Sequence, residues 1–596
     1  MNSINTRLAA LREVMKKTGL AAYIIPSTDP HQSEYVNDYW KIRTYFSDFT
    51  GSAGTLVVTL NEVALWVDSR YFLQVTKQCK DSEVTLFKQS IPHAPEHIPW
   101  LCDVLENNDT VGVDYRQFSK SQIDYLVENA EEKNIQIKND ATLIDSIWQD
   151  RPQLPTNQVA HQPIEFSGQS TQDKLQKIQA QITKEQADYY LISSLDEIAW
   201  LYNIRAHDVD FTPLVISYAL VGRKESYLFC NKNRFNDTLL KTLKNDHITV
   251  IDYDALAEEL PILTEGKTII TDPSSLNYSC FDAIKGTFIY QKSLVKELKA
   301  IKNNVEIANA KKCMEKDGVA MTQFFMWLES ELQLREISEY EIGRKLDGFR
   351  QQQAHYKGES FSAIVSYKNN GAIIHYTAPK EGSAMVKNDG LLLIDSGAQY
   401  QNGTTDVTRT VFLGDTATED EKKSFTLVLK GYITLETIQF PKGTVGMQLD
   451  SFSRMHLWKQ GLNFGHGTGH GIGSYGMVHE DAQGFASSMT TSRGSEVHKE
   501  NQFTTIEPGF YKEGAYGIRT ENVVISYVKQ TTSYGDFIGF EPITLFPIDT
   551  RLIDFKLMTS EEMDWLNSYH KKVLDTLSPI LNATETTWLT EKCKPV

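Results

Sequence analysis

LLLIDSGAQYQNGTTDVTRT, residues 391–410, is the stretch that decides the fold of the C-terminal half of the chain. Its apolar run 391–394 predicts a buried strand that ends on Asp395, and Asn402-Gly403 is typical of a two-residue hairpin turn. In a plain hairpin centred on that dipeptide, Asp395 and Asp406 share a face but are offset by four residues, roughly 13 Å along the strand. If the two carboxylates share one site, the strand must therefore carry a bulge or a bend.

The carboxylate of Asp395 needs a compensating positive charge, because burying an unpaired charge is costly. That charge is either an Arg side chain or a metal ion. The alternative for the whole stretch is an acidic hairpin exposed to solvent.

Two histidines lie in a second stretch, HGTGHGIG at 466–473. Four glycines in eight residues exclude the helical His-x-x-x-His arrangement of zinc proteases. In extended chain, residues four apart share a face, so His466 and His470 can line one wall. A phosphate-binding loop is the rival interpretation, but no lysine follows the glycines.

Two further carboxylates follow the histidines. Glu507 ends an apolar strand just before a Pro-Gly turn, and Glu521 lies within the β-rich run GIRTENVVI at 517–525. A glutamate inside a strand needs a partner, and Arg519 is two residues away on the same face. A buried ion pair between Arg519 and Glu521 is therefore the structural alternative to a functional Glu521.

Four carboxylates and one imidazole thus lie on strand-like segments within about 130 residues of chain. Oxygen ligands with a single imidazole favour Mn²⁺, Co²⁺, Fe²⁺ or Zn²⁺. Five such ligands carry too much charge for one divalent ion but suit two ions that share carboxylates, which predicts a hydrolase with a bridging hydroxide as nucleophile. The predicted ligands are Asp395, Asp406, His470, Glu507 and Glu521.

Composition limits the class of protein. A chain of 596 residues predicts two to four domains, and a formal net charge of -17 argues against nucleic acid or an anionic membrane as the main partner. The sequence has no apolar stretch long enough to span a bilayer and no signal-peptide pattern at its start, which predicts a cytoplasmic protein. The six cysteines have no CxxC spacing and are predicted to be reduced thiols without a catalytic role.

An internal repeat organises the first half of the chain. AYIIPSTD at 22–29 is echoed by YYLISSLD at 189–196, each after a charged helical pattern. We therefore predict two related N-terminal α/β domains, at 1–151 and 156–296, and interpret DRPQLP at 150–155, with its two prolines, as the linker between them. Chance similarity between strand edges is the alternative.

The third predicted domain, 297–596, has an α+β pattern. A helical pattern runs from about 294 to 332, although Gly318 is a potential interruption. Capping boxes predict further helix starts, and a fourth helix is expected at 447–460. These capping boxes pair Ser338 with Glu341, Thr418 with Glu421, and Thr559 with Glu562.

The order and spacing of the five ligands resemble the metal-dependent pita-bread peptidases and, within them, the Xaa-Pro aminopeptidases. The motifs that carry the resemblance to the catalytic domain are IDSGAQY, TTDVTRT, HGTGHGIG, VHE, EPGFY, GIRTENV, GAIIHY and DWLNSYH. HQSEY, FTGSAGT, DSRYFLQ and LDEIAWLYNIR extend it over the N-terminal half. The long three-domain cytosolic form is the best match, with two creatinase-like N-terminal domains and a pita-bread catalytic domain.

The resemblance implies a role for each ligand. Asp395 would chelate one metal ion, Asp406 and Glu521 would bridge both, and His470 with Glu507 would complete the second. The resemblance also implies two divalent ions, with Mn²⁺ the usual activator and Zn²⁺ or Co²⁺ as alternatives.

Other residues are implied in catalysis and substrate binding. Glu507 would also be the general base, and His375 and His479 match the family's substrate-binding and proton-shuttling histidines. His466 matches a further active-site histidine near the prolyl side of the substrate. Arg70 is predicted to assist at the substrate end.

The implied activity is release of the N-terminal residue from peptides with proline at position two, by a homodimer. A prolidase acting on Xaa-Pro dipeptides is one alternative. A non-catalytic binding protein of the same fold is another, and the five filled ligand positions argue against it.

Overall fold

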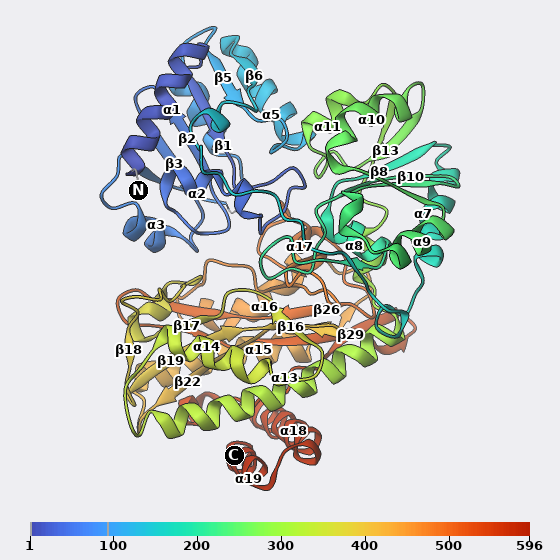
Figure 1. Ribbon diagram of the computed structural model, residues 1–596. Coiled ribbons are helices and arrows are strands. Elements are labelled where there is room, and N and C mark those ends of the chain that lie inside the picture. The colour runs from blue at the N-terminus through green and yellow to red at the C-terminus, as the bar shows by residue number, and fades with distance from the viewer. Residues whose placement is uncertain (1–2, 92–93) are drawn as a thin grey trace. The chain divides into compact units, whose positions relative to one another are not determined.

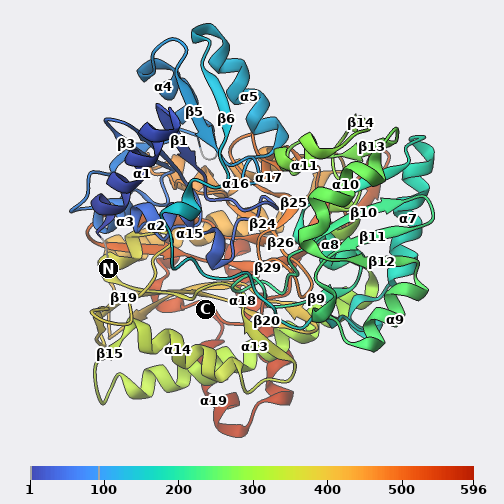
Figure 2. The same cartoon turned by 45° about the horizontal axis from the view of Figure 1, so that its top comes forward.

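The computed structural model describes residues 3–91 and 94–596, which form two compact units (Figure 1, Figure 2). Unit 1 comprises Met1–Pro163 and Gln169–Val295, and unit 2 comprises Ile164–Gly168 and Lys296–Val596.

Unit 1 contains two six-stranded sheets with the same topology, in the orders β4-β3-β2-β1-β5-β6 and β12-β11-β10-β8-β13-β14. In each sheet the central strand, β1 or β8, is antiparallel to one neighbour and parallel to the other. These two strands are the segments that the sequence echo aligned, so the predicted pair of related α/β domains is confirmed.

The first sheet consists of β1 Ala22–Ile25, β2 Thr55–Thr59, β3 Val63–Val67, β4 Thr85–Lys88, β5 Thr110–Val113 and β6 Gln136–Asn139, with helices α1 Ile4–Thr18, α2 Ile42–Ser47, α3 Phe72–Gln78, α4 His97–Val104 and α5 Lys120–Ala130. The second consists of β8 Tyr189–Ile192, β10 Tyr218–Gly222, β11 Ser226–Phe229, β12 Ile248–Ile251, β13 Thr268–Thr271 and β14 Thr287–Tyr290, with α7 Thr171–Lys184, α8 Leu195–Leu201, α9 Asp237–Asn245, α10 Leu256–Thr264 and α11 Tyr278–Ala283.

Strand β1 shows why these sheets read as unbroken apolar runs in the sequence. Tyr23 and Ile25 belong to one core cluster, whereas Ala22 and Ile24 belong to another. Successive side chains of a strand point to opposite faces, so both faces of β1 are covered and every residue must be apolar.

Unit 2 is built from long helices and five sheets, and it contains all the predicted metal ligands. Its α-helices of five or more residues are α12 Lys296–Ala300, α13 Asn304–Glu331, α14 Glu339–Arg350, α15 Glu419–Thr437, α16 Gly446–Trp458, α18 Ser560–Leu577 and α19 Ala583–Lys592. The sheets are β17-β19-β22, β16-β20-β21, β27-β28, β23-β30-β29-β26-β24-β25 and the short pair of β15 Ile337–Ser338 with β18 Met385–Val386. The strands are β16 Tyr356–Glu359, β17 Ile364–Tyr367, β19 Gly390–Ser396, β20 Ala398–Tyr400, β21 Gly403–Thr404, β22 Val407–Leu413, β23 Phe440–Pro441, β24 Gly469–Gly471, β25 Glu480–Phe485, β26 Phe503–Ile506, β27 Gly509–Lys512, β28 Tyr516–Arg519, β29 Asn522–Thr532 and β30 Gly535–Pro542.

Helix α13 is one continuous helix (Figure 1), and Gly318 lies within its bounds, so the potential interruption at this residue does not occur. A Cβ at this position would lie 2.6 Å from the backbone oxygen of Leu545. The glycine therefore allows α13 to pack closely against a neighbouring segment, and it does not end the helix.

The predicted helix starts are found where the capping residues stand. Thr418 with Glu421 and Thr559 with Glu562 form reciprocal capping boxes at α15 and α18. Ser338 caps α14 through the amide of Glu341. All six cysteines are free.

Candidate metal centre

The hairpin at 391–410 turns one residue earlier than predicted. Tyr400 pairs with Gly403, so Gln401 and Asn402 form the turn, not Asn402 and Gly403. The reason is packing against α13: Asn402 donates from Nδ2 to the carbonyl of Asn309 over 3.1 Å, and a Cβ at Gly403 would lie 3.0 Å from the Cβ of Cys313. Gly403 is thus required by close approach to a helix.

This register brings the two aspartates nearer than the predicted offset of four residues. Asp395 pairs directly with Thr408, and Asp406 lies two residues before Thr408, an offset of roughly 7 Å at strand rise. Gly397 on one strand and Thr405 and Asp406 on the other lie outside the named strands, between the sheets β17-β19-β22 and β16-β20-β21. The register is the same on both sides of this interruption, so the pairing of the hairpin is broken here without a β-bulge.

His470 is held in one tautomer by its own strand, β24. Its Nδ1 lies 3.0 Å from the carbonyl oxygen of Gly471, which can only accept, so Nδ1 carries the proton. Nε2 is therefore free of a proton in the neutral ring and lies 3.5 Å from Oδ2 of Asp406 and 3.7 Å from Oε1 of Glu507. An imidazole nitrogen with its other nitrogen fixed by a carbonyl is the usual form of a metal-ligating histidine.

The two predicted glutamate ligands, Glu507 and Glu521, both lie directly next to the end of a strand. Glu507 follows β26 directly and its side chain is 18% exposed. Glu521 lies between β28 and β29, is fully buried, and accepts a hydrogen bond at Oε2 from the hydroxyl of Thr408 over 2.7 Å. A threonine directly opposite Asp395 thus orients Glu521.

Three of the five predicted ligands form a tight buried group. One ligand atom from each of Asp406, His470 and Glu521 lies within 4.8 Å of the others. Burial, together with the charges of Asp395 and Glu507, raises the pKa of the Asp406 carboxyl well above its ordinary value, and burial with Asp406 does the same for Glu521. Buried carboxylates that repel one another at this range are suited to a divalent cation between them.

Asp395 stands beside this group and is paired with an arginine. Arg519 donates from Nη2 to Oδ2 of Asp395 over 2.6 Å, whereas the sequence-based alternative paired Arg519 with Glu521. Arg519 is the last residue of the β27-β28 hairpin, and its Nε donates to the hydroxyl of Thr408 over 3.3 Å. Because Thr408 is paired with Asp395, this contact holds the Arg519 side chain near Asp395. Oδ1 of Asp395 is buried and has no hydrogen-bond partner among the described residues, so this oxygen fits a metal ligand.

His466 belongs to a hydrogen-bond chain that runs through Tyr511 to Arg519. Its Nδ1 lies 2.7 Å from the carbonyl of Gly467, so Nε2 accepts, and the hydroxyl of Tyr511 donates to it over 2.8 Å. Arg519 donates from Nη1 to that same hydroxyl over 2.6 Å. Burial, followed by the charge of Arg519, lowers the pKa of His466 well below its ordinary value, which keeps the ring neutral.

The other predicted residues lie as follows. The ring of His479 packs edge-on against His470, with centroids 4.3 Å apart. His375 lies in the segment after β17 and is close enough for its charge to lower the pKa of His466. Arg70 belongs to unit 1 and pairs there with Asp68 at 2.7 Å, so its role stays a prediction.

Tyr511 and Thr408 are the site residues that sequence reasoning did not single out. Both lie inside quoted motifs, EPGFY and TTDVTRT, but neither is a metal ligand. The spacing from a ligand could have pointed to Thr408. It lies two residues after Asp406, and residues two apart in an extended chain share a face.

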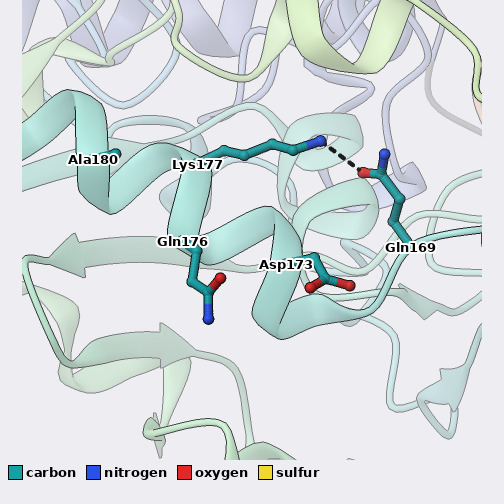
Figure 3. A pocket seen from close by; sticks show the side chains of 5 residues that line it. All are labelled: Gln169, Asp173, Gln176, Lys177 and Ala180. Atoms are coloured by element: carbon teal, nitrogen blue, oxygen red, sulfur yellow. Dashed lines mark hydrogen bonds between the residues drawn. The ribbon is translucent and has the colours of Figure 1, made fainter.

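A pocket on unit 1 has one carboxylate and no histidine or cysteine among its lining residues, so its lining does not resemble the metal centre (Figure 3). It is lined by Gln169, Asp173, Gln176, Lys177 and Ala180, mostly on α7. Its single carboxylate, Asp173, closes the capping box of α7 with Ser170, and Lys177 donates to Gln169 over 3.2 Å. These are ordinary interactions of a helix start.

Family models match most of the chain. Residues 7–147 and 150–306 each match a creatinase/prolidase N-terminal domain. Residues 308–526 match metallopeptidase family M24, and residues 536–596 match the C-terminal region of peptidase_M24.

Known proteins are similar over the full length. A protein named "Probable Xaa-Pro aminopeptidase P" from Coprinopsis cinerea is 38% identical over 99% of this chain and 98% of the relative. A protein of the same name from Fusarium vanettenii is 38% identical over 96% of this chain and 95% of its own. The crystal structure of X-prolyl aminopeptidase from Caenorhabditis elegans, described as a cytosolic enzyme with a di-nuclear active site, superposes over 100% of both chains with a TM-score of 0.94 at 31% identity.

Proposed function

This chain belongs to the Xaa-Pro aminopeptidase P family of M24 metallopeptidases, and we propose which of its side chains carry out that family's reaction. The protein is a metallo-aminopeptidase that releases the N-terminal residue from peptides with proline at position two, and its centre takes two divalent metal ions. The observation that carries the assignment is the buried convergence of Asp406, His470 and Glu521 within 4.8 Å.

Asp395, Asp406, His470, Glu507 and Glu521 would hold the two ions. Three features support this set: the unprotonated Nε2 of His470, the buried Oδ1 of Asp395, which has no hydrogen-bond partner in the part of the chain that the structure describes, and the mutual repulsion of the buried carboxylates. Asp406 and Glu521, whose ligand atoms lie within 4.8 Å of each other, would be shared between the ions, as the family resemblance implies. Removal of any one ligand should reduce metal content before it affects the fold.

The side chains around the ions have separate roles in proton transfer and in substrate binding. When bound, two divalent ions supply a Lewis acid for the scissile carbonyl and activate a water molecule at neutral pH. Glu507 accepts the proton of the attacking water, since its partly exposed carboxylate can meet solvent. His375 and His479 bind the substrate and deliver a proton to the prolyl nitrogen, and His466 lies toward the prolyl side.

The selectivity for proline follows from the substrate's chemistry. A prolyl imide has no N–H and a fixed φ, so peptidases that grip a backbone N–H at that position cannot process it. Asp395, with the ion it holds, would bind the free α-amine, which limits cleavage to one residue. Full-length relatives carry the aminopeptidase name, which favours this activity over a dipeptidase.

Several finer properties are part of the proposal. We expect Mn²⁺ as the activating ion, because it is the usual activator in the family that the sequence resembles, and an oxygen-rich site with one imidazole is compatible with it. A homodimer and a cytoplasmic location are expected from the family resemblance and from the cytosolic C. elegans enzyme, and Arg70 is expected to assist substrate binding. Domain boundaries are proposed at 1–151, 156–296 and 297–596. No helix within residues 3–91 and 94–596 is long and apolar enough to cross a membrane.

The test is a peptidase assay on the full chain loaded with Mn²⁺. Arg-Pro-Pro should be cleaved to free arginine, Arg-Ala-Pro should be cleaved far more slowly, and Arg-Pro should be a poor substrate. Cleavage of Arg-Pro alone would contradict the aminopeptidase assignment and favour the dipeptidase.

A matched pair of variants tests the metal ligands. Glu521→Gln should lose bound metal and lower kcat/KM by at least about 100-fold, as expected for loss of a shared ligand. Glu541→Gln removes a glutamate that forms an ion pair with Lys311 and should leave both quantities unchanged. Two metal ions retained in active Glu521→Gln protein would refute the ligand set.

A further inference from the structure

The segment that contains His375 donates several hydrogen bonds to a single buried carboxylate. Glu339 is the first residue of α14 and has 0% exposed surface. Its Oε1 accepts from the amide of Tyr367 over 2.7 Å and from Nδ2 of Asn370 over 3.0 Å. Its Oε2 accepts from the hydroxyl of Tyr376 over 2.7 Å and from the amide of Ala384 over 3.2 Å.

These donors lie at both ends and in the middle of one stretch of chain, 367–384. Much of that stretch, 373–384, has no helix or strand of its own, so backbone pairing does not determine its course. His375 directly precedes Tyr376, one of the donors. Because Nδ2 of Asn370 also lies 3.1 Å from the hydroxyl of Tyr376, the two sides of the turn are tied to each other as well as to Glu339.

The charge of Glu339 makes this arrangement costly to lose. The four donor groups given above are uncharged, and the first turn of α14 adds the favourable field of a helix N-terminus. Burial, followed by the hydrogen bond to Glu339, raises the pKa of Tyr376, so its hydroxyl stays protonated as a donor at all working pH values. Hydrogen bonds to a buried charge are stronger than neutral ones, and each constrains the stretch by an amount that an uncharged acceptor would not match.

The other side of the stretch rests on the strand that bears Arg519. A Cβ at Gly517 in β28 would lie 1.8 Å from the carbonyl oxygen of Gly371. The backbone around His375 is therefore held between Glu339 on α14 and a close contact with β28. These two constraints come from different elements and leave the stretch little freedom.

We propose that Glu339 is a positioning residue for the peptidase reaction: its carboxylate anchors the 367–384 stretch and thereby places His375 against the substrate. This inference rests on the proposed role of His375 in substrate binding. Glu339 touches neither the metal ligands nor, by this proposal, the substrate, so its effect passes through His375.

A double-mutant cycle on the metal-loaded full chain separates this role from a general contribution to stability. Glu339→Gln replaces two acceptor oxygens by one acceptor and one donor, and should lower kcat/KM for Arg-Pro-Pro by about tenfold or more. In a His375→Ala background the same substitution should change kcat/KM by less than about twofold, because the group it positions is gone. Equal losses in the two backgrounds would overturn the proposal.

Two further variants keep the test decisive. Asp347→Asn alters another buried carboxylate of α14, which binds Tyr356 and Gln351 and not the 367–384 stretch, and should leave kcat/KM within about twofold. If Glu339→Gln does not fold, Tyr376→Phe removes one donor to Glu339 together with the contact of that hydroxyl with Asn370, and should lower kcat/KM in the same direction, with the metal content unchanged. Unchanged kcat/KM in Tyr376→Phe would then overturn the proposal. Failure of wild-type protein to cleave Arg-Pro-Pro would instead refute the proposed function, so the two failures are distinguishable.

Discussion

Arg519 donates from Nη2 to Oδ2 of Asp395 over 2.6 Å, while Oδ1 of the same carboxylate is buried and has no hydrogen-bond partner among the described residues. One oxygen of Asp395 is thus committed to an arginine and the other is available to a metal ion. The sequence argument offered an arginine or a metal as alternatives for balancing Asp395, and the geometry accommodates both at once.

The first prediction concerns the shape of the Arg519 side chain. Its guanidinium contacts Asp395 and Tyr511 through separate nitrogens, which one ammonium group cannot do. Arg519→Lys should therefore lower kcat/KM by about 100-fold, the effect of losing one to two charged hydrogen bonds. Arg551→Lys, at a partly exposed pair with Asp549, is the control and should stay within about twofold. Equal activity of the two variants in steady-state kinetics would contradict the prediction.

The second prediction concerns the hydroxyl of Tyr511, which links Arg519 to His466. Tyr511→Phe leaves Nε2 of His466 without its donor and should lower kcat/KM by about tenfold, with two metal ions retained. Tyr516→Phe removes a hydroxyl on the neighbouring strand that binds Asp420, and should not affect the reaction. The measurement is steady-state kinetics together with metal analysis; metal loss in Tyr511→Phe would show that the tyrosine supports the ions and not His466.

The third prediction is a dependence of stability on pH that arises far from the metal ligands. Glu436 in α15 accepts a hydrogen bond from Nε1 of Trp565 in α18 over 2.5 Å, and burial raises the pKa of its carboxyl to about 7. Because the folded pKa is raised, Glu436 contributes stability at pH below about 4.5, and this contribution is lost as pH rises through about 7. The loss is on the order of 3 kcal/mol between those values.

Glu436→Gln should therefore be more stable than wild type at pH 8 and similar to it at pH 5. Urea midpoints followed by tryptophan fluorescence at several pH values measure the difference. Glu561→Gln, an exposed residue of the first turn of α18, should show no such trend. A wild-type curve parallel to that of Glu436→Gln across this range would rule out titration of Glu436.

The fourth prediction tests the close contact beneath His375. In Gly517→Ala the added Cβ meets the carbonyl oxygen of Gly371 at 1.8 Å, so the backbone must move, at a cost of about 1–3 kcal/mol. Both Tm and kcat/KM should fall. Gly348→Ala in α14 meets no atom within 4 Å and should keep full activity and gain up to about 1 kcal/mol of helix stability. Full activity in Gly517→Ala would show that the 367–384 stretch tolerates displacement.

Much of the fold is determined locally and was therefore predictable. Thr418 and Glu421 cap α15 through contacts between residues three apart in the chain. The repeat at 22–29 and 189–196 appears as two strands buried on both faces, a condition that imposes apolar residues at every position. The types of the proposed ligands follow from chemistry, since only a few side chains can hold a divalent ion, and three of the five, Asp406, His470 and Glu521, converge in the structure.

Tertiary structure alone decided the register and the partners. Asn402-Gly403 has the composition of a turn, but packing against Asn309 and Cys313 moved the turn by one residue and halved the offset between Asp395 and Asp406. Arg519 had Glu521 as its neighbour in sequence, yet the β27-β28 hairpin directs it to Asp395. In each case a contact between residues distant in sequence outweighs the local preference, because burying a charge or a backbone without its partner costs more than shifting a turn by one residue.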